Sequence, residues 1–225
     1  MSALPYQSTE KFVTSLKRVI ALKPEHISAY SLIIEKGTPF YEKYGEGERA
    51  EARRRRELPD EDTERMMYQF TKNILWSYGY HRYEISNYAK PGKECRHNLG
   101  YWDRTEYLGI GAGSSSLIKG ERFDHIRDRK AYIEKIRNGE SILIDREILS
   151  VESQMEEFMY LGLRKVEGVS RTDFQNCFGK NVDDVYGKIL DKLEEEQLLE
   201  FSGDRIRLTH RGMDVSNCVL AEFLF

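Results

Sequence analysis

Residues 83–116 bring together several side chains that could bind a ligand, in the order YEISNYAKPGKECRHNLGYWDRTEYLGIGAGSSS. Cys95 and His97 supply a thiol and an imidazole, which together give at most two metal ligands. Tyr101 and Trp102 add two large aromatic rings directly afterwards. The glycines of LGIGAG, at residues 108–113, would let the backbone approach another surface closely. The segment therefore has the residue types of a site for a flat or metal-containing ligand.

The same residues also fit a purely structural role. We expect Pro91 and Gly92 to reverse the chain and residues 95–98 to lie on the loop that follows. In the structural alternative this loop is buried, its two aromatic rings fill the core, and His97 bonds a backbone carbonyl. Residue chemistry alone leaves both alternatives open.

Three stretches resemble one known family. The segment YEISNYAKPGKECRHNLGYW with YLGIGAG resembles the HemW heme chaperones, which are related to the HemN oxygen-independent coproporphyrinogen III oxidases of the radical SAM proteins. Within it, HNLGYW matches the HNxxYW pattern by which HemW-type chains differ from HemN oxidases. The start, SALPYQS, is similar to a GLPGQT-like turn of the family, with Tyr6 where glycine is usual, and LTHRGMDVSNCVLAEFL is similar to its usual end. The resemblance covers essentially the whole chain but only the C-terminal half or so of the family's length.

The resemblance implies a heme chaperone whose cargo is held at HNxxYW. His97 would then be the axial ligand of the heme iron, and Asn98 would orient its ring. Tyr101 and Trp102 would stack on the macrocycle. The expected partners are heme and heme-accepting proteins, some of them at the membrane surface.

A radical SAM oxidase acting on coproporphyrinogen III is the alternative function. Ile33 and Ser115 match positions that line the S-adenosyl-L-methionine (SAM) pocket in HemN, although many HemW-like chains have histidine near residue 115, within GAGAHS. Such enzymes hold a [4Fe–4S] cluster on a CxxxCxxC loop, and Cys95, Cys177 and Cys218 do not have that spacing. We therefore expect this chain to bind no cluster and to be inactive as an enzyme alone, with the missing barrel strands lying before Met1. A structural remnant without function is a third possibility.

Hydrophobic periodicity predicts an α/β region of residues 1–145, followed by an α+β domain of residues 146–225. In the first region we expect an amphipathic helix over 8–22, a buried parallel strand over 26–34, and a helix from residue 60 to 78 with Met67, Phe70, Ile74 and Tyr78 inside. We also expect a turn over 35–41 and a solvated loop or helix face over 45–57. A short strand with Tyr83 and Ile85 should follow and break at Asn87. By the resemblance, this region is the C-terminal edge of a partial (β/α) radical SAM barrel.

The second half is predicted to be mainly helical. We expect a hairpin at Lys119-Gly120, a helix over 124–138 with His125 on the surface near its start, and a short extended piece at 142–144. Three helices then start near residues 153, 170 and 182, before a hairpin at 202–204 and a terminal helix over 209–224. This order is that of a winged-helix-like HemN C-terminal domain. Cys177 and Cys218 are expected on buried helix faces.

Composition narrows the class of protein further. Charged residues make up 32% of the 225 residues, and the net charge is −3. No nucleic-acid binding is expected, because the third helix of the second domain, DKLEEEQLLE, is too acidic for a DNA groove. No apolar run approaches the ~20 residues of a membrane span, and the N-terminus does not resemble a secretion signal. We expect a cytoplasmic protein.

Overall fold

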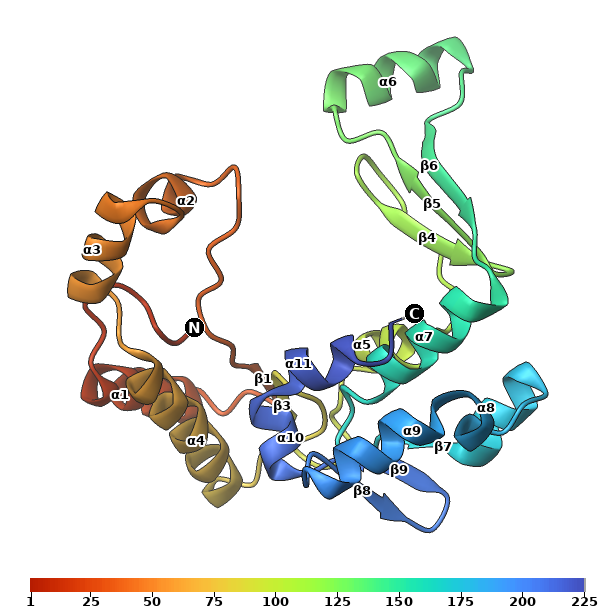
Figure 1. Ribbon diagram of the computed structural model, residues 1–225. Coiled ribbons are helices and arrows are strands. Elements are labelled where there is room, and N and C mark those ends of the chain that lie inside the picture. Colours follow the sequence, from red (N-terminus) through yellow and green to blue (C-terminus); the bar gives the residue numbers. More distant parts are fainter. Residues whose placement is uncertain (225) are drawn as a thin grey trace. The chain divides into compact units, whose positions relative to one another are not determined.

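The computed structural model describes residues 1–224, and the chain divides into two compact units, Met1–Cys95 and Arg96–Phe225 (Figure 1). The elements of the first unit are α1 (Thr9–Ala21), β1 (His26–Ser28), α2 (Pro39–Tyr44), α3 (Glu48–Glu57), α4 (Glu61–Ser77), β2 (His81–Arg82) and β3 (Asn87–Ala89). Those of the second unit are α5 (Arg96–Trp102), β4 (Ser115–Ile118), β5 (Glu121–His125), α6 (Arg129–Asn138), β6 (Leu143–Ile148), α7 (Val151–Gly162), β7 (Val169–Ser170), α8 (Arg171–Phe178), α9 (Val182–Glu195), β8 (Leu199–Ser202), β9 (Arg205–Leu208), α10 (His210–Asp214) and α11 (Ser216–Ala221).

Helices α1 and α4 form the core of the first unit together with the sheet β1-β3-β2. The predicted helix α1 is confirmed: Ser8 accepts from the Lys11 amide at its start, and its apolar stripe of Phe12, Leu16 and Ile20 is buried. The predicted stripe of α4 is wrong in part. Its buried residues are Met67, Thr71 and Leu75, whereas Phe70 and Tyr78 are exposed.

The predicted parallel strand over residues 26–34 is largely wrong. Only β1 is a strand, and it pairs with β3 in the antiparallel direction. A single parallel bridge joins Ser2 to Ser31 farther along. Side chains at Tyr30 and Ile33 are exposed, which confirms the expectation that this stretch leaves apolar surface uncovered within the unit.

Residues 35–57 form two short helices: α2 overlaps the expected turn over 35–41, and α3 is the helix alternative of the solvated loop or helix face expected over 45–57. Thr38 caps α2 by accepting from the Tyr41 amide. Helix α3 carries the arginine run, and Glu57 at its end is buried and accepts from the Tyr44 hydroxyl at 2.7 Å. The charged segment is therefore a helix with one buried carboxylate.

Strands β2 and β3 lie on either side of the residues predicted to be a strand. The buried Glu84 carboxylate accepts from the Ser86 amide at 2.7 Å and from Asn87 Nδ2 at 2.6 Å, and these bonds form a local turn. Asn87 therefore begins a strand instead of ending one. The expected Pro91-Gly92 turn is confirmed, with the Lys93 amide bonded to the Lys90 carbonyl.

Strands β4, β5 and β6 form an antiparallel sheet in the second unit. The predicted hairpin at Lys119-Gly120 is confirmed, with both residues at positive φ (50° and 72°). Helix α6 begins later than predicted, because Asp128 caps it by accepting from the Ala131 amide. His125 consequently lies in β5 and is buried, so its predicted surface position is wrong.

Helices α7, α8 and α9 followed by the β8–β9 hairpin confirm the predicted winged-helix-like order (Figure 1). Ser150 caps α7, not Ser153 as expected, while Ser170 caps α8 as expected. An aromatic cluster fills this part of the core, with edge-to-face contacts among Phe158, Phe174, Phe178, Tyr186 and Phe223.

The predicted terminal helix is two short helices, α10 and α11, because Val215 leaves the helical conformation between them. Cys177 and Cys218 are exposed, so their predicted core positions are wrong. The two compact units divide at Cys95/Arg96, and the predicted domain boundary near residue 145 stays a prediction.

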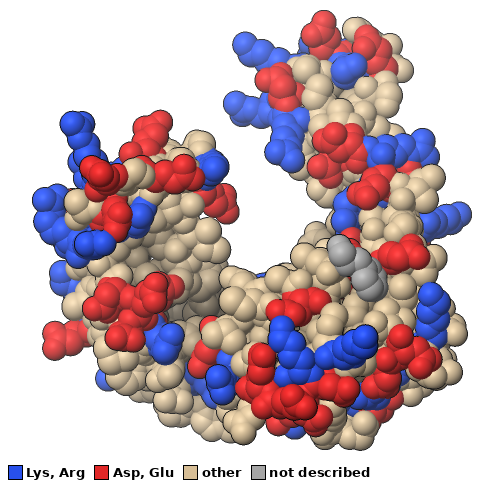
Figure 2. Space-filling view, in the orientation of Figure 1, with Lys and Arg blue, Asp and Glu red and all other residues tan. Residues whose placement is uncertain are grey.

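Basic and acidic side chains are interspersed on the face that Figure 2 shows. Over residues 1–224, no helix combines the length and apolar character that crossing a membrane requires.

Candidate heme-binding site

The HNLGYW segment forms helix α5, so the predicted loop at residues 95–98 is wrong. The helix ends in a Schellman motif: the Thr105 amide bonds the Gly100 carbonyl at 2.8 Å, and the Arg104 amide bonds the Tyr101 carbonyl at 3.2 Å. Arg104 takes the left-handed conformation that this motif requires, at φ 54°. A loop was predicted because the segment contains Gly100 and follows the Pro91-Gly92 turn. The seven residues of Arg96–Trp102 are nevertheless enough for two helical turns.

Helical geometry sorts the four predicted site residues into two pairs. His97 and Tyr101 are four residues apart, and their ring centroids lie 4.6 Å apart at an interplanar angle of 73°. Both side chains are exposed. Asn98 and Trp102 form the second pair, about 100° farther round the helix, and both are half-buried.

Trp102 is half-buried and packs against the Arg164 side chain. The Arg164 guanidinium lies 4.5 Å from the centroid of its ring, and Trp102 Nε1 is buried without a hydrogen-bond partner among the described residues. Asn98 is one position along the helix from His97, and its expected orienting role stays a prediction.

A small hollow of about 170 Å³ lies beside His97 and Tyr101. Tyr107 also lines it, and the Tyr107 ring meets Tyr101 edge-on at 4.7 Å and 87°. Burial raises the pKa of the Tyr107 hydroxyl, so this group is neutral in the ordinary pH range. Arg96, Gly100, Thr105 and Glu106 complete the lining.

This site fits heme at its surface and not within a cavity. Pockets that enclose a drug-sized ligand measure roughly 300–1,000 Å³, so the hollow is too small to surround a macrocycle. The His97 imidazole is exposed, and an imidazole nitrogen can ligate heme iron. A heme held here would keep much of its surface outside the protein.

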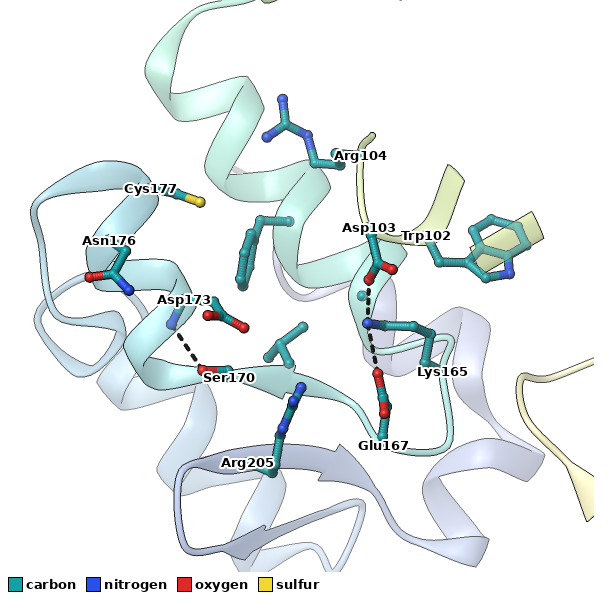
Figure 3. Close-up of a pocket in the computed structure, with 13 residues that line it drawn as sticks. Trp102, Asp103, Arg104, Lys165, Glu167, Ser170, Asp173, Asn176, Cys177 and Arg205 are labelled. Carbon is teal, nitrogen blue, oxygen red and sulfur yellow. Dashed lines mark hydrogen bonds and ion pairs between the residues drawn. The ribbon is translucent and has the colours of Figure 1, made fainter. Parts of the chain in front are cut away.

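A larger cavity of about 430 Å³ lies in the same unit, at the end of α5 (Figure 3). Trp102, Asp103 and Arg104 form one wall. Lys165 is buried and pairs with Asp103 and, at 3.3 Å, with Glu167. Apart from Trp102, the predicted site residues do not line it.

The two residues suggested for a SAM pocket lie in different compact units. Ile33 belongs to the first unit and is 73% exposed. Ser115 belongs to the second unit, where it is exposed on β4 opposite Asp124. Neither residue lines either of the two cavities.

The cysteines do not fit an iron–sulfur cluster. Cys95 is half-buried, whereas Cys177 and Cys218 are exposed. Within the part of the chain that the structure describes, no three His, Cys, Asp or Glu side chains lie close enough to hold a metal ion.

The structure adds a buried ion cluster that the sequence reasoning missed. Glu157 of α7 is 4% exposed and pairs with Arg104 Nε at 3.0 Å and with Arg122 Nη2 at 2.8 Å. The helical period gave no signal for it, because Glu157 lies about 200° round the helix from the buried Met155 and Met159. A second missed contact joins the buried His125 Nδ1 to Ser114 Oγ at 2.8 Å and ties down the glycine loop.

The fold of the chain is that of HemN-related proteins. It superposes on the structure described as "Coproporphyrinogen III oxidase (HemN) from Escherichia coli is a Radical SAM enzyme" with a TM-score of 0.76 and 18% sequence identity, over 98% of this chain and 52% of that one. Residues 149–215 match the HemN C-terminal domain family.

Sequence comparison points to a particular branch of these proteins. The chain is 37% identical to the heme chaperone HemW of Bacillus subtilis, over 100% of its own length and 57% of that protein. It is 36% identical to HemW of Lactococcus lactis, over 99% of this chain and 56% of that one. The chain therefore belongs to the HemW-like family and corresponds to the C-terminal portion of its relatives, spanning about half their length.

Proposed function

We propose that this chain is the heme-handling portion of a HemW-like heme chaperone and that His97 is the iron ligand. The observation that carries the proposal is the exposed His97 imidazole, set edge-on to Tyr101 beside a hollow too small to enclose the cargo. Relatives that span the whole chain are named heme chaperones, which supports heme as the cargo. Heme-accepting proteins are the proposed recipients.

An exposed ligand suits transfer better than storage. The residues around His97 bind one side of the cargo, and the rest of the macrocycle stays accessible to an acceptor. Tyr101 contributes an aromatic edge next to the imidazole and limits the rotation of its ring. The neutral Tyr107 hydroxyl adds no negative charge to the lining of the hollow.

A porphyrinogen oxidase is the second candidate, favoured by the fold shared with HemN. The three cysteines of this chain do not fit the cluster that this chemistry needs. Oxidase activity would therefore depend on residues that this chain does not supply.

Heme titration tests the proposed ligand. Hemin is added to the parent chain, to His97→Ala and to Cys95→Ala, which removes the neighbouring thiol as a matched control. Loss or shift of the Soret band in His97→Ala, with the band retained in Cys95→Ala, supports the proposal. Added imidazole should restore the band in His97→Ala. Identical titrations of all three proteins would mean that His97 is not the ligand.

A further inference from the structure

The end of α5 is attached to α7 and the turn that follows it by three consecutive residues. Trp102 lies under the Arg164 guanidinium, with 4.5 Å between the charge and the ring centroid. Asp103 pairs with the buried Lys165. Arg104 pairs with Glu157 at 3.0 Å. Each contact joins segments more than 50 residues apart in sequence, so helix α5 owes its position to α7.

Arg104 occupies a backbone position for which glycine is the usual residue. It is the left-handed residue of the Schellman motif, at φ 54°. A left-handed conformation is unfavourable for residues with a Cβ atom, so an arginine here needs a compensating contact. Its Nε–H donates to Glu157 Oε2, and its Nη2 lies 3.4 Å from Gln154 Oε1.

Glu157 also connects to His97 by a second route. Its other oxygen, Oε1, pairs with Arg122 Nη2 of β5 at 2.8 Å. The Arg122 charge in turn acts electrostatically on the Tyr107 hydroxyl, and the Tyr107 ring meets Tyr101 edge-on. Tyr101 meets His97 in the same way, with 4.6 Å between ring centroids.

We infer that Glu157 is a positioning residue for His97, an inference that rests on the proposed heme-binding role of that histidine. One carboxylate oxygen holds the C-terminal end of α5 through Arg104, and the other holds Arg122, whose charge acts on the Tyr107 hydroxyl. Without the negative charge, two arginines are left beside a neutral side chain. The end of α5 and Arg122 then lose their common anchor, and the His97 ring samples more orientations.

The NMR resonances of the His97 ring protons report this change in ring orientation directly. The chain contains five histidines, and the pair of ring-proton resonances absent from His97→Ala assigns that residue. The Tyr101 ring lies against His97. The Tyr101→Leu variant removes this ring and therefore shows where the His97 resonances lie without the contact. In Glu157→Gln we expect the His97 resonances to move toward that position, while the other four pairs stay in place.

Glu57→Gln is the matched control. Glu57 is 6% exposed and is held by the Tyr44 hydroxyl, by Lys43 at 3.0 Å and by Arg56 at 2.8 Å, in the other compact unit. The Glu57→Gln substitution removes a carboxylate that is similarly buried and paired, and it should leave the His97 resonances unchanged. Glu157→Asp keeps the charge and should return the resonances part of the way to the parent.

Heme titration of the same variants separates the two proposals. We expect Glu157→Gln to raise the Kd for hemin about tenfold and Glu57→Gln to leave it unchanged. Unmoved His97 resonances in Glu157→Gln, or equal movement in Glu57→Gln, would overturn the inference. So would an unchanged hemin affinity in Glu157→Gln when His97→Ala abolishes binding. If the parent and His97→Ala bind hemin alike, the proposed ligand fails, and the resonances alone decide whether Glu157 positions His97.

Discussion

Arg104 donates to Glu157 across 3.0 Å while its own backbone lies in the left-handed region at φ 54°. The two facts oppose each other energetically, because the backbone conformation favours glycine and the ion pair needs arginine. Arg104, just after the end of α5, is thereby paired with the buried Glu157 carboxylate in the middle of α7. The proposed heme-binding face depends on this pair for its position.

Substituting Arg104 separates the two effects. Arg104→Gly loses the ion pair but relieves the left-handed backbone, whereas Arg104→Ala loses the pair and keeps the unfavourable conformation. We expect both variants to be destabilised, and Arg104→Ala by about 1 kcal/mol more than Arg104→Gly.

Urea denaturation measures the difference if it is followed by tryptophan fluorescence in a Trp76→Phe background. The remaining tryptophan, Trp102, then reports only the second unit. Equal stabilities of the two variants would contradict the role assigned to the backbone.

Glu57 should make the first unit sensitive to acid. Hydrogen bonds from Arg56, Tyr44 and Lys43 hold the pKa of this carboxyl well below its ordinary value of 4.5. The folded state therefore binds fewer protons than the unfolded state. The stabilisation is complete above about pH 4.5 and is lost as the pH falls toward the lowered pKa.

Amide hydrogen exchange of residues 39–57 between pH 5 and pH 3 tests this, after correction for the intrinsic rate. Protection should fall with pH in the parent and stay nearly level in Glu57→Gln. A parallel fall in both proteins would assign the acid sensitivity to other groups.

The chain should bind no [4Fe–4S] cluster. Its cysteines stand at positions 95, 177 and 218, and the described residues contain no three-ligand group of His, Cys, Asp or Glu. Anaerobic reconstitution followed by iron and sulfide analysis checks the expectation. A stoichiometric cluster with an EPR signal after reduction would contradict it.

Limited proteolysis should locate the domain boundary. The compact units divide at Cys95/Arg96, next to the exposed Lys93 in the turn after β3. The sequence alone places the boundary between residues 139 and 150 instead, where β6 is paired with β5. Because paired strands resist proteases, we expect trypsin to cut first near Lys93 and to leave a stable fragment that begins near Arg96. A first cut within 139–150 would support the boundary near residue 145.

Some elements followed directly from the sequence because their interactions are local. Ser8 and Ser170 cap helices by accepting from amides three residues later, and Lys119-Gly120 forms a two-residue hairpin turn. The order of three helices and a hairpin in the C-terminal domain was predicted from such signals and from hydrophobic spacing. The segments YEISNYAKPGKECRHNLGYW and YLGIGAG likewise indicated the HemW-like family.

Other features could not be read from neighbouring residues. Helix α5 is too short to have a clear hydrophobic period, and contacts with α7 more than 50 residues away hold its end in place. His125 is buried because Asp128 delays the next helix and leaves it in β5, where Ser114 meets its ring.

The sequence by itself determined the family, the C-terminal domain and the residues at which heme binding is proposed. Only the tertiary structure decided which of those residues face outward, because that depends on what the other side of α5 packs against. Arg164 covers Trp102, while His97 and Tyr101 on the next side of the helix stay exposed. Glu157 has its role for the same reason: its two arginines come from positions 104 and 122, which only folding brings to one carboxylate.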